Sequence, residues 1–509
     1  MRFTTIDRYA RPPASARDEA FLEDDRWDDF GYKTLWRLIY VDTQGQSHTI
    51  GQVKIGESGL EDGSPNLRSS FTKLGKGFFS LGQDDEYYSN LQELENETRV
   101  EILTALRDVA LDLSLFEQVM DEQVTRVSLM RGISESTVRN QYHRMARGGA
   151  RLSPYSFSYS TPQESPTADP IPVTELSFAV QPGSRPPSTV HVIIGRNGVG
   201  KSFLLNNMTN VLVRGETPES GRIKFRRPDD ETQASRFANV VSVAFSAFDE
   251  FEPLRRQPQG EDRLKYSYIG LKVVAKTGAE GQQAPKSYRA LASEFGKSVS
   301  ACVAEPRRSR WRRALEILQS DPVFADAISQ FANVETDETL RDAAREVFRN
   351  LSSGHKIVLL TMTRLVETVD EATLVLLDEP ESHLHPPLLA AFIRALSDLL
   401  EDRNGVAIIA THSPVVLQEV PRSCVWKLRR AGDELIPTRP EIETFGENVG
   451  TLTQEVFGLE VTASGFHRTL QEAVDAGADY EDVMRMFDGQ LGAEGRALAQ
   501  SMAFMAQRR

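Results

Sequence analysis

The stretch GRNGVGKS, residues 195–202, constrains the fold of this chain more than any other. It fits the pattern G-x-x-x-x-G-K-[ST], follows the strand-like run STVHVIIG and precedes the helix-like run FLLNNMTNVLV. Glycines in such a loop let several backbone N–H groups point at one phosphate, and the start of the next helix adds the positive end of its dipole. The sequence therefore predicts a phosphate-binding loop between a buried strand and a helix.

Residues of this loop supply the candidate contacts to a nucleotide. Lys201 is expected to reach the β- and γ-phosphates of ATP, and Ser202 is expected to ligate Mg²⁺. The predicted nucleotide-binding residues are Gly195, Arg196, Asn197, Gly198, Val199, Gly200, Lys201, Ser202 and Phe203. ATP and Mg²⁺ are therefore the expected cofactors.

The run LVLLDEPE, residues 374–381, is an apolar strand that ends in adjacent acids. Ligands of open α/β sheets bind at the carboxyl ends of the strands, which is where Asp378 and Glu379 are expected to lie. Asp378 is the candidate Mg²⁺ ligand, and Glu379 is the candidate that orients or deprotonates the attacking water. Taken alone, the two acids could merely cap a helix N-terminus. The phosphate loop favours the catalytic interpretation.

Two further stretches supply polar residues at element ends. GVAIIATHSP predicts another strand that ends at His412, which could hydrogen-bond the γ-phosphate or be purely structural. NLSSGHK, residues 350–356, opens a helix-like run with small polar residues. Ser352, Ser353 and Gly354 could bind a phosphate at that helix N-terminus, and the phosphate would belong to ATP held by another copy of the chain. The alternative is that Ser352 or Ser353 only caps the helix.

The order of strand-like and helix-like runs predicts the organisation of the chain. NVVSVAF, TLVLLDE and GVAIIATH alternate with helical segments, which is typical of a mostly parallel sheet covered by helices. We expect an acidic flexible lead at 1–30, a hairpin plus helical subdomain at 31–150, a nucleotide-binding domain at 151–440 and a C-terminal helical segment at 441–509. The hairpin is read from TLWRLIYVD and SHTIGQVKIGE.

Charge and composition limit the classes of partner. The net charge of −14 over 509 residues argues against a surface that binds nucleic acid everywhere. PRRSRWRR offers a local DNA contact through Arg307 to Arg313, with Trp311 available to stack on a base, although a solvated helix face is the alternative. Cys302 and Cys424 are too far apart in sequence for a Cys-x-x-Cys metal site.

The sequence also lacks the usual signs of membrane insertion or export. No run of about 18 apolar residues occurs, and the N-terminus lacks the order of a signal peptide. We therefore expect a cytoplasmic protein that does not contact the membrane. The acidic start DEAFLEDDRWDDFG is not favoured as a metal site.

With these four motifs in order, the chain resembles the ABC-type ATPases, and among them the soluble SMC, RecF and OLD-like heads. Residues 195–202 match Walker A, 374–379 match Walker B, 351–355 match the LSGGQ signature and His412 matches the switch histidine. The resemblance implies an α/β P-loop NTPase of ABC/SMC-head type, in which helices cover both faces of a mostly parallel sheet and an antiparallel β lobe is added. A helical N-terminal insertion and C-terminal helices complete this expected architecture.

The sequence departs from the resemblance at several points. His355 replaces the glutamine of the signature, and HLH, residues 383–385, stands where transporter heads have an aspartate. A metal site at His383 and His385 is not favoured. The glutamine loop has no clear counterpart, and Ser246, Asp249 and Gln257 are its candidates. The resemblance covers about 189–427, and the hairpin near 36–55 is considered as part of the same lobe.

DEPESHLHPP is similar to the form found in compact OLD-like and Septu PtuA-like ATPases of bacterial anti-phage systems. The resemblance then implies a homodimer or higher homo-oligomer that encloses ATP, with a separate effector such as a nuclease. In this interpretation Glu379, His412 and Lys201 are the catalytic residues. The alternative is a RecF-like DNA-repair clamp, whereas a transporter subunit is disfavoured by DEPESHLHPP and the acidic soluble extensions.

Overall fold

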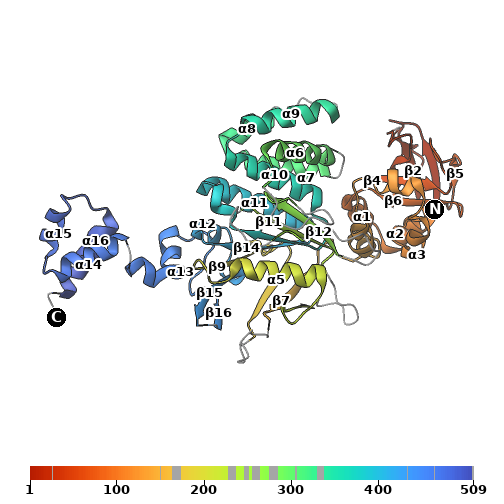
Figure 1. Ribbon diagram of the computed structural model, residues 1–509. Coiled ribbons are helices and arrows are strands. Elements are labelled where there is room, and N and C mark those ends of the chain that lie inside the picture. The colour runs from red at the N-terminus through yellow and green to blue at the C-terminus, as the bar shows by residue number, and fades with distance from the viewer. Residues whose placement is uncertain are drawn as a thin grey trace.

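The computed structural model arranges the chain as a central α/β domain with an additional body at each end (Figure 1). The N-terminal sheet and its helices lie at one side, and the C-terminal helices lie at the opposite side. The structure describes residues 1–25, 27–149, 151–162, 173–226, 237–245, 252–254, 264–273, 285–303, 307–329, 337–432, 434–463 and 465–506.

A seven-stranded sheet forms the centre of the molecule, in the order β12-β11-β13-β14-β9-β15-β16. The first six strands in this order are parallel, and β16 pairs with β15 in the antiparallel direction. The prediction of a mostly parallel sheet is therefore confirmed. Its strands are β9 (Val190–Gly195), β11 (Asn239–Ala244), β12 (Lys265–Gly270), β13 (Thr373–Asp378), β14 (Val406–Thr411), β15 (Val425–Ala431) and β16 (Glu434–Thr438).

Apolar side chains alternate between the two faces of this sheet, so both faces are buried. On β13, Val375 and Leu377 join one core, whereas Leu374 and Leu376 join the other. Helix α5 (Lys201–Arg214) packs in the second core, and a larger group of helices covers the first core. That group comprises α6 (Tyr288–Cys302), α7 (Arg307–Leu318), α8 (Pro322–Ser329), α9 (Asp337–Asn350), α10 (Ser353–Thr368) and α11 (Pro386–Asp402).

A three-stranded antiparallel sheet, in the order β10-β7-β8, packs in the same core as α5. Its strands are β7 (Tyr155–Ser160), β8 (Glu175–Val180) and β10 (Arg222–Arg226). Phe157 stacks against Phe178 and Phe225 with ring centroids 5.0 and 5.6 Å apart. This sheet is the predicted antiparallel lobe.

The N-terminal body is a six-stranded sheet, in the order β5-β1-β2-β3-β4-β6, with helices packed on it. The strands β3 (Leu35–Val41) and β4 (Ser47–Glu57) form the predicted hairpin. They pair within this sheet and not with the seven-stranded sheet, so the hairpin is not part of the lobe formed by residues 189–427. The other strands are β1 (Arg2–Ile6), β2 (Glu19–Asp24), β5 (Ser70–Phe71) and β6 (Phe78–Gly82).

The prediction of a flexible lead over residues 1–30 is also wrong. β1 and β2 pair in parallel inside the sheet, and Phe3, Phe21 and Leu22 are fully or almost fully buried. Much of the acidic character lies in the segment after β2, where Asp29 is buried and pairs with Lys54 at 2.6 Å and with Arg131 at 2.6 Å. These pairs make Asp29 a structural carboxylate.

Short helices fill the segment after β6 and connect the N-terminal body to the centre. They are α1 (Asp85–Gln92), α2 (Asn96–Ala105), α3 (Leu113–Val119), the π-helices η1 (Thr125–Leu129) and η2 (Thr137–Tyr142), and α4 (His143–Ala146). Arg144 of α4 pairs with the buried Glu371 at 2.7 Å, and Arg151, after α4, pairs with Asp402 at 2.5 Å. These ion pairs hold the N-terminal body against the central domain.

The C-terminal segment has two parts. Helix α13 (Val449–Ala463) belongs to the central domain, because Leu452 and Val456 lie in its core and Glu455 pairs with Lys427 at 2.6 Å. The helices α14 (Gly465–Asp475), α15 (Tyr480–Met486) and α16 (Ala493–Ala506) share a small core of their own. Among the described residues, no helix is both long enough and apolar enough to cross a membrane.

Candidate nucleotide-binding and hydrolysis site

The phosphate loop lies between β9 and α5, at the carboxyl end of the parallel strands. Gly198 and Gly200 have φ angles of 75° and 106°, in the left-handed region that glycine adopts without strain. A Cβ atom on Gly195 would lie 2.6 Å from the carbonyl oxygen of Leu428, so β15 also requires glycine there. Arg196, Asn197 and Gly198 are exposed at the tip, whereas Val199 is buried and anchors the loop.

Lys201 is buried at the base of this loop, and its ammonium points at the strand ends. Its Nζ donates to the carbonyl oxygens of Gly195 and Arg196 at 3.1 and 3.2 Å, and it lies 2.7 Å from His412 Nε2. Burial lowers the pKa of Lys201, although the neighbouring carboxylates, Glu379 first among them, oppose that shift. Ser202 follows as a half-buried residue on α5, and Phe203 is half exposed.

The two acids at the end of β13 face different surroundings. Asp378 is the last residue of the strand and pairs in register with Ala410 of β14 and Ala244 of β11. Glu379 turns the chain with φ 46° and ψ 57° and precedes the 3₁₀ helix η3 (Pro380–His383). This left-handed conformation is uncommon for a residue with a side chain and is typical of functional sites. It directs the carboxylate of Glu379 to His412, whose Nε2 lies 2.9 Å from Glu379 Oε1.

Glu381 is a residue of the site that the sequence reasoning missed. Its Oε1 accepts hydrogen bonds from the Thr411 hydroxyl at 2.6 Å and from the His412 backbone N–H at 2.7 Å. Glu381 therefore holds the end of β14 against η3 and positions the ring of His412. The third acid of DEPE was the available signal, because it follows Glu379 by two residues at the same strand end.

The signature turn begins α10, and Ser352 is its N-cap. The Ser352 hydroxyl lies 2.6 Å from His355 Nδ1 and accepts the His355 backbone N–H at 3.5 Å. The capping role left open from the sequence is therefore observed. Ser352 and Ser353 remain exposed, whereas Gly354 is buried. A Cβ atom on Gly354 would lie 2.5 Å from the His383 carbonyl oxygen, so the glycine allows η3 to pack on the turn.

The segment around Trp311 does not have the predicted form of a DNA contact. Trp311 is 5% exposed and its indole N–H donates to the Thr363 hydroxyl at 3.0 Å, so it cannot stack on a base. Arg313 pairs with Asp398 at 2.5 Å. Arg308, Arg310 and Arg313 line a cavity of about 880 Å³ that acidic residues also line, among them Asp25, Asp84 and Asp85.

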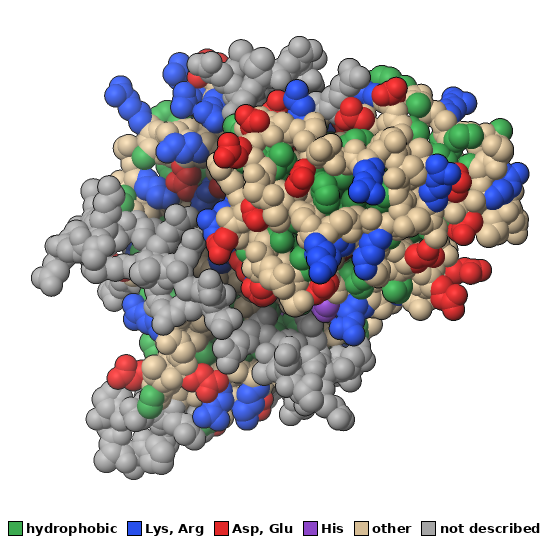
Figure 2. Space-filling model, turned by 90° about the vertical axis from the view of Figure 1, so that its right-hand side faces the viewer, with side chains coloured by type: hydrophobic (Ala, Val, Ile, Leu, Met, Phe, Trp, Pro, Cys, Tyr) green, Lys and Arg blue, Asp and Glu red, His purple; other side chains and the backbone are tan. Residues whose placement is uncertain are grey.

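The arginines of α7 thus share a cavity with carboxylates of the N-terminal body, and Arg313 pairs with a carboxylate of α11 in the same molecule. Figure 2 shows one face of the molecule, on which both Lys and Arg and Asp and Glu side chains are exposed. The three candidates for the glutamine loop, Ser246, Asp249 and Gln257, lie outside the described residues.

The arrangement fits a nucleotide with Mg²⁺. Left-handed glycines open the loop, a buried lysine lies at its base, and Asp378 ends the neighbouring strand beside β14. Ser202 and Asp378 are the oxygen donors of the type that Mg²⁺ prefers. Lys201, Glu379 and His412, which are far apart in the sequence, lie together at this edge of the sheet.

Comparison with known families gives a match to the central domain. A family profile described as "AAA domain, putative AbiEii toxin, Type IV TA system" matches residues 215–418. The matched range includes the signature turn, the acids after β13 and His412, and it begins after the phosphate loop. Residues 215–418 of the central domain are thus similar to an AAA domain.

Two solved structures illustrate the similarity to ATP-binding cassettes. A nucleotide-free ATP-binding cassette from an ABC transporter is 13% identical, with a TM-score of 0.31 and coverage of 61% of this chain and 100% of that chain. The cbiO1 subunit from Clostridium perfringens, part of the ABC transporter complex cbiONQ, is 16% identical, with a TM-score of 0.29 and coverage of 67% and 98%. Because these TM-scores are low, the fold is assigned from the sheet order and the phosphate loop.

A similarity over nearly the whole chain comes from a phage protein. Protein ea59 of Escherichia phage lambda is 38% identical over 527 residues, which cover 99% of this chain and 98% of that protein. The similarity therefore includes the N-terminal body and the C-terminal helices as well as the ATPase domain. The chain belongs to the same protein family as protein ea59 of phage lambda.

Proposed function

We propose that the protein is an ATP-binding and ATP-hydrolysing switch, in which two copies enclose ATP between them. The observation that carries the proposal is the convergence of Lys201, Glu379 and His412 at the carboxyl ends of the central strands. A buried ammonium, a carboxylate and an imidazole beside a phosphate loop are groups that can stabilise phosphate charge and position a water for phosphoryl transfer.

Each group has a distinct proposed role. Lys201 neutralises charge on the β- and γ-phosphates, and Ser202 with Asp378 holds Mg²⁺, which neutralises further charge when bound. Glu379 orients the attacking water and accepts its proton, since its carboxylate is partly exposed beside His412. His412 hydrogen-bonds the γ-phosphate, and Glu381 positions it through the backbone N–H.

Enclosure of ATP by a second copy follows from the signature turn. Ser352 and Ser353 are exposed at the N-terminus of α10, where free backbone N–H groups and the helix dipole favour an anion. In the proposed dimer, Ser352, Ser353 and Gly354 of one copy contact the γ-phosphate held by the loop of the other. Binding of ATP then joins the copies, and hydrolysis separates them.

We also propose that the protein is the cytoplasmic ATPase component of an anti-phage defence complex that gates a separate effector. The matching family profile, which is described as a "putative AbiEii toxin", and the phage origin of the related protein ea59 support a role in conflict between phages and bacteria. The helices α14 to α16 are the candidate docking region, since Phe466, Met486 and Met505 are 47%, 65% and 64% exposed there.

The RecF-like alternative loses support, because Trp311 is buried.

The variant Glu379→Gln tests the switch. It should bind ATP but hydrolyse it at least roughly 100-fold more slowly than the wild type, so that the ATP-joined dimer accumulates. Sedimentation velocity in saturating Mg²⁺ and ATP is the measurement, with the double variant Glu379→Gln, Lys201→Ala as the matched control that cannot hold the phosphates. If Glu379→Gln has the same mass with ATP as without it, the proposed switch is wrong.

Effector docking is tested with a chain that ends at residue 464. This cut keeps α13, whose Leu452 and Val456 belong to the central core, and removes α14 to α16 with their separate core. Purification of the Glu379→Gln form from its host with ATP present should yield a stoichiometric protein partner, and the shortened form should lose it while retaining ATP binding. Recovery of the same partner with the shortened form would exclude these helices as the docking region.

A further inference from the structure

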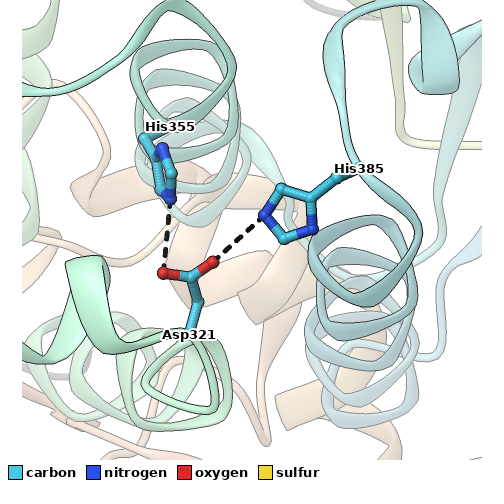
Figure 3. A group of neighbouring side chains, drawn as sticks. All are labelled: Asp321, His355 and His385. Carbon is cyan, nitrogen blue, oxygen red and sulfur yellow. Dashed lines mark hydrogen bonds and ion pairs between the residues drawn. The ribbon is translucent and has the colours of Figure 1, made fainter.

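We propose that Asp321, His355 and His385 form a binding site for a divalent transition metal ion such as Zn²⁺, separate from the Mg²⁺ site of the phosphate loop. The three side chains come from the residue before α8, the first turn of α10 and the residue before α11. Figure 3 shows both imidazoles pointing at the carboxylate of Asp321. One donor atom from each residue lies within 4.8 Å of the other two.

The distances suit ligands around an ion better than they suit direct ion pairs. His355 Nε2 lies 3.3 Å from Asp321 Oδ1, and His385 Nε2 lies 3.3 Å from Asp321 Oδ2. A charge-assisted N–H···O bond is normally about 2.7–2.9 Å long. Bonds of about 2.0–2.1 Å from Zn²⁺ to nitrogen and oxygen, arranged tetrahedrally, separate neighbouring ligand atoms by about 3.3 Å.

The surroundings of His355 prepare its Nε2 atom to bind a metal. Its Nδ1 lies 2.6 Å from the Ser352 hydroxyl, which can accept Nδ1–H in the tautomer whose Nε2 lone pair points to Asp321 and to the proposed ion. A hydrogen bond from the second ring nitrogen is the usual support of a metal-bound histidine. Phe324 also packs on the ring, with centroids 5.2 Å apart.

The other two residues leave room for the ion and an entry path. The side chain of Asp321 is 11% exposed, and its Oδ1 accepts the Val323 backbone N–H at 2.9 Å, which fixes the carboxylate. The side chain of His385 is 52% exposed and lines the route to solvent. His385 Nδ1 faces the Leu388 N–H at 3.4 Å, so only a long hydrogen bond is lost when Nδ1 takes the proton and Nε2 binds the ion.

The class of ion follows from the ligand types. Two imidazoles and one carboxylate suit Zn²⁺ and neighbouring divalent transition metals, whereas Mg²⁺ prefers oxygen donors alone. Three protein ligands leave a position for water. A bound ion joins the starts of α8, α10 and α11. It also fixes the position of the Ser352 hydroxyl through the hydrogen bond between Ser352 and His355.

The experiment measures Zn²⁺ binding to the full-length, nucleotide-free protein by competition with a chromophoric chelator. Millimolar Mg²⁺ is present so that it occupies any metal site built from oxygen ligands alone. The test variants are His385→Ala and Asp321→Asn. The matched control is His383→Ala, an exposed histidine two residues from His385 that does not join the group. Circular dichroism checks that each variant is folded.

We expect a single Zn²⁺ ion per chain, with affinity that falls at least about tenfold in both test variants and changes less than twofold in the control. Co²⁺ should give the visible absorption of a four- or five-coordinate ion, and His385→Ala should lose it. If the wild type binds no Zn²⁺ under these conditions, or if His383→Ala loses as much affinity as His385→Ala, the proposal is overturned.

Discussion

At the residue scale, the acids of DEPE show what the sequence could and could not predict. Asp378 and Glu379 were predicted because they end an apolar strand beside a phosphate loop. The left-handed turn at Glu379 and the use of Glu381 to hold His412 were not predictable, because each depends on how η3 meets β14. A metal site at His383 and His385 was not favoured from the sequence. The structure instead groups His385 with Asp321 and His355, which come from distant segments and therefore form no local sequence pattern.

Gly354 gives a prediction at this scale. The substitution Gly354→Ala places a Cβ atom 2.5 Å from the His383 carbonyl oxygen, so η3 or α10 must shift. Overpacking of this kind typically costs about 1–3 kcal/mol in the free energy of unfolding. Urea unfolding measures it, with Gly77→Ala as the control, since a Cβ atom there meets no atom within 4 Å. Equal stability of the two variants would show that the turn is not tightly packed.

At the element scale, the central strands were predictable and the first two strands were not. β9, β13 and β14 are short apolar runs bounded by turn residues and buried on both faces, and this pattern is visible in the sequence itself. β1 pairs with β2 and with residues 70–71, while charged and proline residues separate β1 from β2. Local composition therefore indicated a flexible lead where long-range pairing forms a sheet.

His191 on β9 gives a prediction of pH dependence. Burial lowers the pKa of His191 to about 3, and its Nε2 hydrogen-bonds the Ala179 carbonyl oxygen at 3.2 Å. The unfolded chain binds a proton below about pH 6.5 while the folded chain does not, so the free energy of unfolding falls as the pH drops from about 6.5 towards 3. This contribution is at most about 1.4 kcal/mol per pH unit.

The variant His191→Gln removes that titration. Urea unfolding at pH 7 and pH 5.5, followed by tryptophan fluorescence, should show a smaller loss of stability for His191→Gln than for the wild type. The exposed His383→Gln is the control and should follow the wild type. A loss of stability in His191→Gln as large as that of the wild type would mean that His191 is not held neutral by burial.

At the scale of the whole molecule, contacts between distant parts of the chain explain the misread basic segment. The arginines of α7 line a cavity with acids of the N-terminal body, and Arg151 pairs with Asp402, which lies 251 positions away. A cluster that looks like a nucleic-acid contact in the sequence therefore lines a cavity together with acidic residues, and one of its members, Arg313, pairs with Asp398 of α11.

The central proposal also concerns the whole molecule: each ATP site combines the phosphate loop of one copy with the signature turn of another. Such a pairing between identical copies is symmetric, so a dimer contains two equivalent sites. A variant damaged in the loop and a variant damaged in the turn should each be inactive alone. Mixed together, they form a dimer in which one site has an intact loop and an intact turn.

The most direct test is therefore to mix Lys201→Ala with Ser352→Arg and to measure ATP turnover. We predict that each variant alone has little activity and that an equal mixture recovers about a quarter of the wild-type rate, because about half of the dimers are mixed and each has one intact site. Self-mixed samples of each variant are the controls. A mixture no more active than the sum of the two variants alone would contradict the shared site.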